Sequence, residues 1–180
     1  MWILQWMMWI IFCRKGYLDS LRFIIIVRTP IQIPMITISD LNGKEDNYTW
    51  WLNIMPDEMP RLSILPKAVR DRLDYSMESL DLIEDYIREN YTAEELKERK
   101  NRYARDLFAR YIGETFRKNV SDLFWSFESG NEKDEYFGIP VLASIGGGMP
   151  PMTPTVWVTE LMAQQEGHFL RSRVKTLKAA

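Results

Sequence analysis

Apolar residues recur at helical spacing in two stretches near the middle of the chain. In the first stretch Leu80, Ile83, Ile87 and Tyr91 share one face, and Ser76 precedes them. Serine is a preferred residue just before a helix, because its side chain accepts a hydrogen bond from a free backbone N–H. The pattern therefore predicts a helix over residues 77–90.

The second stretch begins where Thr92 and Glu95 have the spacing of a capping box. An apolar stripe follows, and the pattern predicts one continuous helix from there to about Val120. The stripe comprises Tyr103, Leu107, Phe108, Tyr111, Ile112, Thr115 and Phe116. The opposite face carries acid-first pairs at i,i+4, and we interpret it as a solvated face. These pairs are Glu95–Arg99, Glu98–Arg102, Asp106–Arg110 and Glu114–Lys118.

Alternating aromatic positions predict a hairpin over residues 123–145, with Trp125 and Phe127 on one side and a turn at Gly130-Asn131. Two earlier stretches, residues 21–41 and 48–55, also have the composition of strands. After the hairpin, the order of Thr153 and Pro154 indicates the start of a last helix. We expect Gly167 to bend or divide that helix.

These elements predict an α+β fold. Two central amphipathic helices pack antiparallel or crossed, and a C-terminal helix and a small antiparallel sheet cover them. A proline-rich connector precedes the first helix. We therefore expect an irregular N-terminal extension over residues 1–60, with short strands in it, and a single α+β domain over residues 61–180.

Composition and charge disfavour several kinds of partner and site. The formal net charge of −2 gives no positive field for a nucleic acid, so no nucleic-acid partner is expected. Cys13 is the only cysteine, which excludes an internal disulfide and suits the cytoplasm. His168 is the only histidine, so the ligands of a zinc site are missing. A magnesium or calcium site made of carboxylates alone stays open, but the sequence shows no loop signature for one, and we expect no metal and no cofactor.

The first thirteen residues, MWILQWMMWIIFC, are almost wholly apolar. As a helix they would be about 20 Å long, against about 30 Å of hydrocarbon in a bilayer, so they are too short to span it. A signal peptide is also disfavoured, because no basic residue precedes the run and no small-residue cleavage site follows it. A packed segment, a mistaken start codon and a peripheral membrane anchor formed by residues 2–12 remain open.

Gly113 and Glu114 interrupt the stripe of the second helix. Glycine costs about 1 kcal/mol relative to alanine inside a helix, so we expect another segment to approach the backbone closely at Gly113, beside Ala109. Glu114 has two interpretations. It is either a general base with a perturbed pKa or a partly buried member of an ion pair.

Two motifs in order, LDYSMESLDLIE and YIGE, followed by a tryptophan strand, resemble uncharacterised small bacterial proteins with LDxSxxSLxxLE and YxGE motifs. The resemblance covers residues 62–177 and implies an immunity-like protein that neutralises a partner toxin. It marks as motif or interaction candidates Leu73, Asp74, Ser76, Ser79, Leu80, Glu84, Tyr111, Gly113, Glu114 and Trp125.

The sequence is compatible with two functions. The first is a non-enzymatic cytoplasmic protein-binding domain, because no catalytic constellation is visible in the sequence. The alternative is a small hydrolase or transferase that uses Glu84 or Glu114 with Tyr111. That alternative requires the carboxylates to converge in a concave pocket.

Overall fold

The computed structural model describes residues 37–55, 62, 64–164 and 167–179. These residues belong to one compact unit, Pro34–Ala180. Its elements, in chain order, are η1 (Ile38–Asp40), α1 (Glu45–Asn53), α3 (Lys67–Arg70), α4 (Met77–Asn90), α5 (Ala93–Lys97), η3 (Arg99–Asn101), α6 (Arg102–Asn119), β1 (Leu123–Phe127), β2 (Pro140–Ser144), α7 (Pro154–Glu160), η4 (Leu161–Ala163) and α8 (Phe169–Ala179). Helices with a small antiparallel sheet confirm the predicted α+β class.

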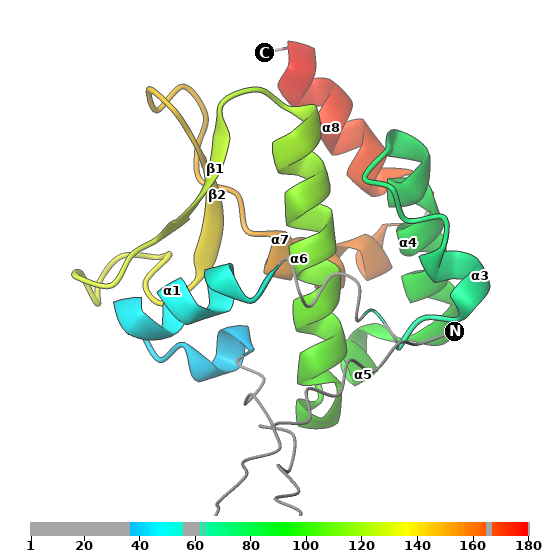
Figure 1. Cartoon of the computed structure of the whole chain (residues 1–180), viewed down its shortest axis with the longest axis horizontal. Helices are drawn as coiled ribbons and strands as arrows, with labels where there is room; N and C mark the ends of the chain where they lie inside the picture. Colours follow the sequence, from blue (N-terminus) through cyan, green and yellow to red (C-terminus); the bar gives the residue numbers. More distant parts are fainter. Residues whose placement is uncertain (1–36, 56–61, 63, 165–166, 180) are drawn as a thin grey trace, which may run out of the picture. The chain divides into compact units, whose positions relative to one another are not determined.

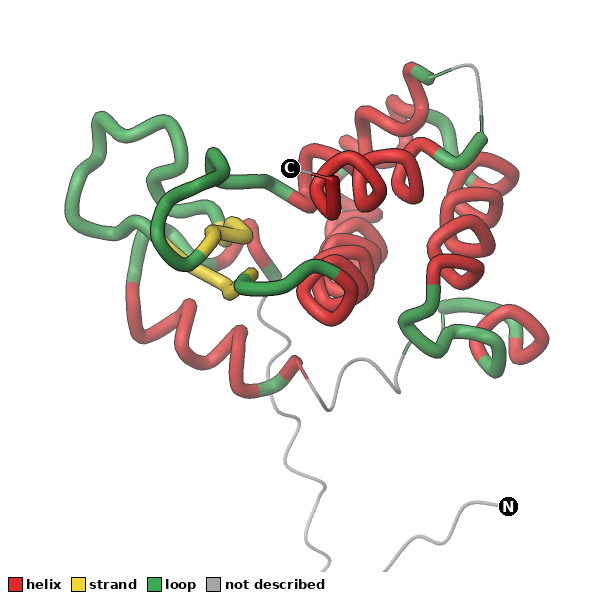
Figure 2. The backbone as a smooth tube through the Cα atoms, turned by 90° about the horizontal axis from the view of Figure 1, so that it is seen from above, coloured by secondary structure: helices red, strands yellow, loops and turns green. Residues whose placement is uncertain are grey.

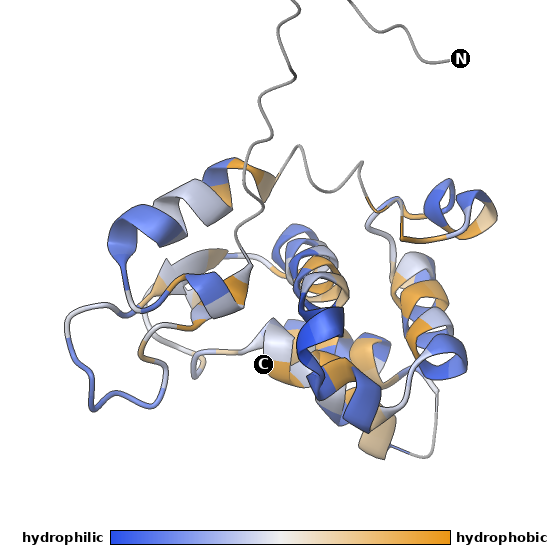
Figure 3. Ribbon diagram, turned by 90° about the horizontal axis from the view of Figure 1, so that it is seen from below, coloured by the Kyte–Doolittle hydropathy of each residue, from blue (hydrophilic) through white to orange (hydrophobic). Residues whose placement is uncertain are grey.

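Helix α6 is the centre of this unit. It contacts α4, α5, α7, α8 and β1, and Figure 1 shows it standing between the sheet and the pair α4 and α8. The predicted apolar stripe is buried, with Leu107, Phe108, Ile112 and Phe116 all inaccessible to solvent. Figure 3 shows apolar and hydrophilic residues on different sides of the same helices, as amphipathic packing requires.

Helix α4 spans the residues predicted for it. The Ser76 side chain accepts a hydrogen bond from the Ser79 N–H (3.1 Å), so the predicted N-cap is confirmed. Leu80, Ile83 and Ile87 are fully buried, which confirms the apolar face. Burial of three such side chains is the main reason that this sequence is stable as a helix.

The helix predicted from residue 92 to 120 is not continuous. The capping box of Thr92 and Glu95 is present, but α5 ends at Lys97 and the backbone of Glu98 is extended. Two later side chains donate hydrogen bonds to backbone carbonyl groups of α5. Asn101 donates to the backbone oxygen of Glu95, and Arg105 donates to the backbone oxygen of Leu96. Because these side chains satisfy the free carbonyls, the chain can turn before α6 starts.

The predicted strand over residues 48–55 is wrong, because this segment contains most of helix α1. Tyr48 and Trp51 are buried three residues apart on one helical face, whereas Trp50 between them is 40% exposed. The predicted extension over residues 1–60 therefore includes residues that belong to the core. Of the strands expected before it, residues 21–36 lie outside the described residues, and Ile38–Asp40 form the 3-10 helix η1.

The predicted hairpin is confirmed. Strands β1 and β2 pair antiparallel, with Trp125 opposite Leu142. Figure 2 shows the two short strands beside the helices, joined by a long loop. Gly130-Asn131 is not the hairpin turn, because residues 128–139 connect the strands and Glu128 accepts hydrogen bonds from both of these N–H groups inside the loop.

The C-terminal helical region is divided, as expected near Gly167. Helix α7 starts at Pro154, and Thr153 occupies the N-cap position without a side-chain hydrogen bond. Helix α8 begins at Phe169, after His168, which has a positive φ of 68°. The division lets α8 turn back and pack on α4 and α6.

Candidate functional site

The residues of the first motif, LDYSMESLDLIE, connect the start of α4 to α6. Asp74 accepts a hydrogen bond from the Ser76 N–H (2.9 Å), and the Ser79 hydroxyl donates to the Ser76 carbonyl (2.8 Å). From α6, the Tyr111 hydroxyl donates to Ser79 Oγ (2.6 Å) and accepts from the Tyr75 N–H (3.0 Å). Burial raises the pKa of Tyr111. Its phenol is therefore a neutral, fully hydrogen-bonded link between two helices.

Glu84 ends the first motif and caps a different helix. Its carboxylate is completely buried and accepts hydrogen bonds from the N–H groups of Phe169 (3.1 Å) and Leu170 (2.9 Å). An Arg88 guanidinium nitrogen lies 2.8 Å from its Oε1. A negative charge at the N-terminus of a helix is stabilised by free N–H groups and by the helix dipole. Glu84 thus fixes the start of α8 on α4.

Gly113 is where the Trp125 ring meets the backbone of α6. A Cβ built on this glycine would overlap Cζ2 and Cη2 of Trp125 and would lie 3.2 Å from Cγ of Pro154. Any other residue would force these neighbours to move. The expected close approach at Gly113 is confirmed, and the approaching group comes from β1.

Glu114 binds the N–H group of the same Trp125 indole. Trp125 Nε1 donates to Glu114 Oε1 (2.7 Å), and Arg117 donates to both carboxylate oxygens at 2.9 Å. Burial would raise the pKa of Glu114, but the hydrogen bonds from Arg117 and Trp125 and the nearby positive charges lower it overall. The expected Glu114–Lys118 pair is not formed. Instead, Lys118 lies 3.3 Å from the centre of the Tyr75 ring.

Replacing Glu114 with glutamine should destabilise the fold by about 1–2 kcal/mol at neutral pH, because the three charge-assisted hydrogen bonds from Arg117 and Trp125 are weakened or lost. The folded protein lowers the pKa of this carboxyl, so its stabilising effect is complete above the ordinary value of 4.5 and is lost as pH falls through the lower folded value. Urea unfolding of both proteins at several pH values should show curves that converge below pH 4.5. A difference that is constant with pH would contradict this assignment.

The sequence did not reveal a buried ion pair between α6 and the N-terminal elements. Asp106 and Arg110 were expected on a solvated face, but their side chains are 3% and 1% exposed, with Nε and Oδ2 2.7 Å apart. Asp106 also accepts from the Ile38 N–H and from Trp51 Nε1, both at 3.0 Å. Burial raises the pKa of Asp106, and Arg110 and these donors oppose that effect. The prediction was wrong because α1 covers this face.

The other pairs expected on that face are also replaced among the described residues. Arg102 pairs with Asp40 (3.3 Å), and Glu98 pairs with Lys100 (2.9 Å). Glu95 is engaged in its capping box. Spacing along a helix therefore identified possible partners, but the neighbouring segments decided which partners meet.

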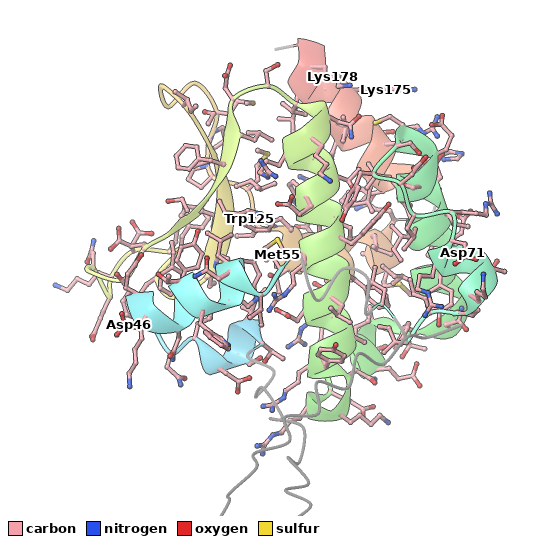
Figure 4. The ribbon with its side chains drawn as sticks, viewed as in Figure 1. Asp46, Met55, Asp71, Trp125, Lys175 and Lys178 are labelled. Carbon is pink, nitrogen blue, oxygen red and sulfur yellow. The ribbon has the colours of Figure 1, made fainter. Side chains whose placement is uncertain are left out.

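A groove of about 590 Å³ opens where α1, α6 and β1 meet. Its lining residues are Leu52, Met55, Tyr75, Glu114, Arg117, Lys118, Phe124 and Trp125. Figure 4 shows Met55 and Trp125 next to each other beside α6. Of the charged residues in the lining, one is acidic and two are basic, and the acid is already paired with Arg117. The groove thus combines apolar and aromatic groups with a positive rim.

Only some of the motif candidates line this groove. Glu114 and Trp125 line the groove, whereas Asp74, Ser76, Ser79, Glu84, Tyr111 and Gly113 do not. Glu84 is bonded to α8 and Tyr111 to Ser79, so the structure does not bring Glu84, Glu114 and Tyr111 together in one pocket. Sequence reasoning missed the contributions of Leu52, Met55 and Phe124. The 43% exposure of Phe124 in a strand is a tertiary property, and no local signal indicates it.

The part of the chain that the structure describes shows neither a metal site nor a membrane-spanning helix. No group of three or more His, Cys, Asp or Glu side chains is arranged to hold a metal ion there. None of the helices in these residues has both the length and the apolar character needed to cross a bilayer. In comparisons with known proteins, no protein-family model, no curated protein and no solved structure matches the chain.

Proposed function

We propose that this chain is a non-enzymatic protein-binding domain, and that the groove between α1, α6 and β1 is its docking surface. The groove presents Phe124, which is 43% exposed, beside Met55 and Trp125. Aromatic residues, methionine and arginine are the types enriched at protein interfaces. A partner side chain that filled the groove would bury apolar surface and meet cations at the edge.

The observation that carries this proposal is the contrast between the motif residues and the groove. Tyr111, Glu84 and Glu114, the residues of the enzymatic alternative, are each occupied by partners within the fold. Arg117, Lys118 and Phe124 in the groove are exposed to solvent. The motifs therefore support a scaffold, and the exposed groups beside it supply the binding surface.

The most specific form of the proposal is an immunity-like role in the cytoplasm. The two motifs resemble those of uncharacterised small bacterial proteins, some of which resemble immunity proteins, and this resemblance supports the role. In this form, the domain neutralises a toxin by binding it. Binding alone suffices for such a role, because an inhibitor needs to cover the active surface of its partner and performs no reaction of its own.

Site-specific crosslinking tests the docking surface. A photoreactive phenylalanine analogue at position 124 should crosslink one partner in cells of the source organism, with mass spectrometry identifying it. Position 156 is the control, because Val156 in α7 is 41% exposed, close to the 43% of Phe124. Coexpression of the captured protein with and without this chain then measures neutralisation as growth.

Two outcomes would contradict the proposal. Equal capture from positions 124 and 156 would mean that the groove is not the docking surface. Capture specific to position 124, with no effect of this chain on the growth defect or activity of the partner, would exclude the neutralising role and leave a binding domain.

A further inference from the structure

One edge of strand β1 is unpaired among the residues that the structure describes. The sheet contains β1 and β2, and the other side of β2 bridges to Met152. Among the described residues, β1 has no strand on its other side. An open edge presents backbone N–H and C=O groups that can pair with another chain.

The register shows which groups of β1 face outward. Leu142 exchanges two hydrogen bonds with Met152 (2.8 and 2.9 Å), so the backbone of Leu142 points away from β1. In an antiparallel ladder, residues directly opposite each other point either both inward or both outward. Trp125 lies opposite Leu142, so its N–H and C=O point away from β2. Because this orientation alternates along the strand, the N–H and C=O groups of Leu123 and Phe127 also point away from β2.

The groove meets β1 at Phe124 and Trp125. Phe124 and Trp125 are consecutive in β1, so their side chains project from opposite faces of the sheet, yet both line the groove. A groove reaches both faces where it follows the edge of the strand. Tyr48 and Trp51 of α1 pack on the rings of Phe127 (4.7 Å between ring centres) and Trp125 (5.3 Å), so α1 covers the side chains on that face of β1. On the other face, Phe124 is 43% exposed.

We propose that the partner docks by adding an extended, acidic segment to β1 as a third strand. This inference rests on the proposed function and specifies its chemistry. Main-chain hydrogen bonds to Leu123 and Trp125 would supply the pairing, and side chains on alternate positions would supply specificity. One face of the added strand lies beside Phe124, and the other faces the basic residues of α6.

The charge of the groove is complementary to an acidic segment. Arg117 neutralises Glu114, and Lys118 has no carboxylate within ion-pair distance among the residues that the structure describes. One positive charge therefore remains at the rim. An added strand with acidic side chains toward α6 and apolar side chains toward Phe124 meets both surfaces. We expect segments in which acidic and apolar residues alternate.

Amide hydrogen exchange tests the pairing directly. In the free protein the amides of Leu123 and Trp125 should exchange faster than those of Phe124 and Ser126, which pair with β2. The probe is a blocked seven-residue peptide of alternating valine and glutamate. Its binding should slow exchange at Leu123 and Trp125 by roughly tenfold or more. A peptide with lysine in place of glutamate should bind more weakly.

Two charge reversals provide matched variants. Lys118→Glu should weaken binding of the glutamate peptide by about three- to tenfold, because an attraction becomes a repulsion at a partly exposed site. Lys97→Glu makes the same change in net charge on α5, next to the opposite end of α6, and should leave binding unchanged. Circular dichroism of both variants checks that the fold is retained.

The outcomes separate this inference from the proposed function. If the glutamate peptide does not bind at millimolar concentration, or binds without protecting Leu123 and Trp125, strand addition is wrong. Specific crosslinking from position 124 would then still support a protein-binding groove. Equal crosslinking from positions 124 and 156 removes the groove as the docking surface, whatever the peptide does.

Discussion

Replacing Asp106 with alanine should destabilise the fold by about 3–5 kcal/mol, the range for breaking a buried ion pair by removal of one partner. Arg110, whose side chain is 1% exposed, would lose the carboxylate 2.7 Å from its Nε. The Ile38 N–H and the Trp51 indole N–H would lose their shared acceptor. Because these donors come from η1 and α1, we expect both elements to loosen from α6.

Urea unfolding, followed by circular dichroism, measures this loss. Glu98→Ala is the control, since Glu98 pairs with Lys100 at the surface and its side chain is 47% exposed. The control should leave the free energy of unfolding unchanged within error. If Asp106→Ala cost less than about 1 kcal/mol, the buried network would not stabilise the fold as the geometry indicates.

Replacing Glu84 with alanine should have the second-largest effect, about 3 kcal/mol, for the same reason. The change removes a fully buried carboxylate that pairs with Arg88 and accepts the N–H groups of Phe169 and Leu170. We expect the destabilisation to concentrate at α8. Amide exchange in α8 should therefore accelerate more than exchange in α6.

The control for Glu84 lies on the same helix. Glu78 pairs with Arg171 of α8, but its side chain is 77% exposed. Glu78→Ala should change stability little and should leave exchange in α8 close to that of the unaltered protein. A Glu84→Ala variant with unchanged stability and unchanged exchange in α8 would contradict the structural role of Glu84.

Local signals in the sequence predicted the elements that depend on local interactions. The N-cap at Ser76 and the capping box of Thr92 and Glu95 are formed as predicted, because these hydrogen bonds join residues three apart. The alternation of Trp125 and Phe127 likewise placed β1 correctly. Gly113 was informative because a glycine inside a helix has a cost that tertiary packing must offset.

Tertiary contacts explain the failures. Residues 48–55 have a composition typical of a strand, but Trp51 packs edge-on against Trp125 and donates to Asp106, which requires the helix α1. The same contact buries Asp106 and Arg110, whose i,i+4 spacing indicated a surface pair. The groove depends on α1 as well. Its contributions from Leu52 and Met55 follow from the placement of α1 beside α6, which periodicity does not encode.

The position of the Trp125 ring against Gly113 can be tested directly by substitutions at both residues. Gly113→Ala should destabilise the protein in the natural background, because overpacking of about 1–3 kcal/mol outweighs a gain of about 1 kcal/mol in helix propensity. Trp125→Leu removes Cζ2 and Cη2, the two atoms that a Cβ would overlap. In that background Gly113→Ala should stabilise the protein by up to about 1 kcal/mol.

The free energies of unfolding of the four proteins form a double-mutant cycle, and urea titrations at one pH provide them. We predict a coupling of about 2 kcal/mol between positions 113 and 125, with the effect of Gly113→Ala changing sign. If alanine at position 113 had the same effect in both backgrounds, the ring would not occupy that place on α6, and the architectural role of the motif would be contradicted.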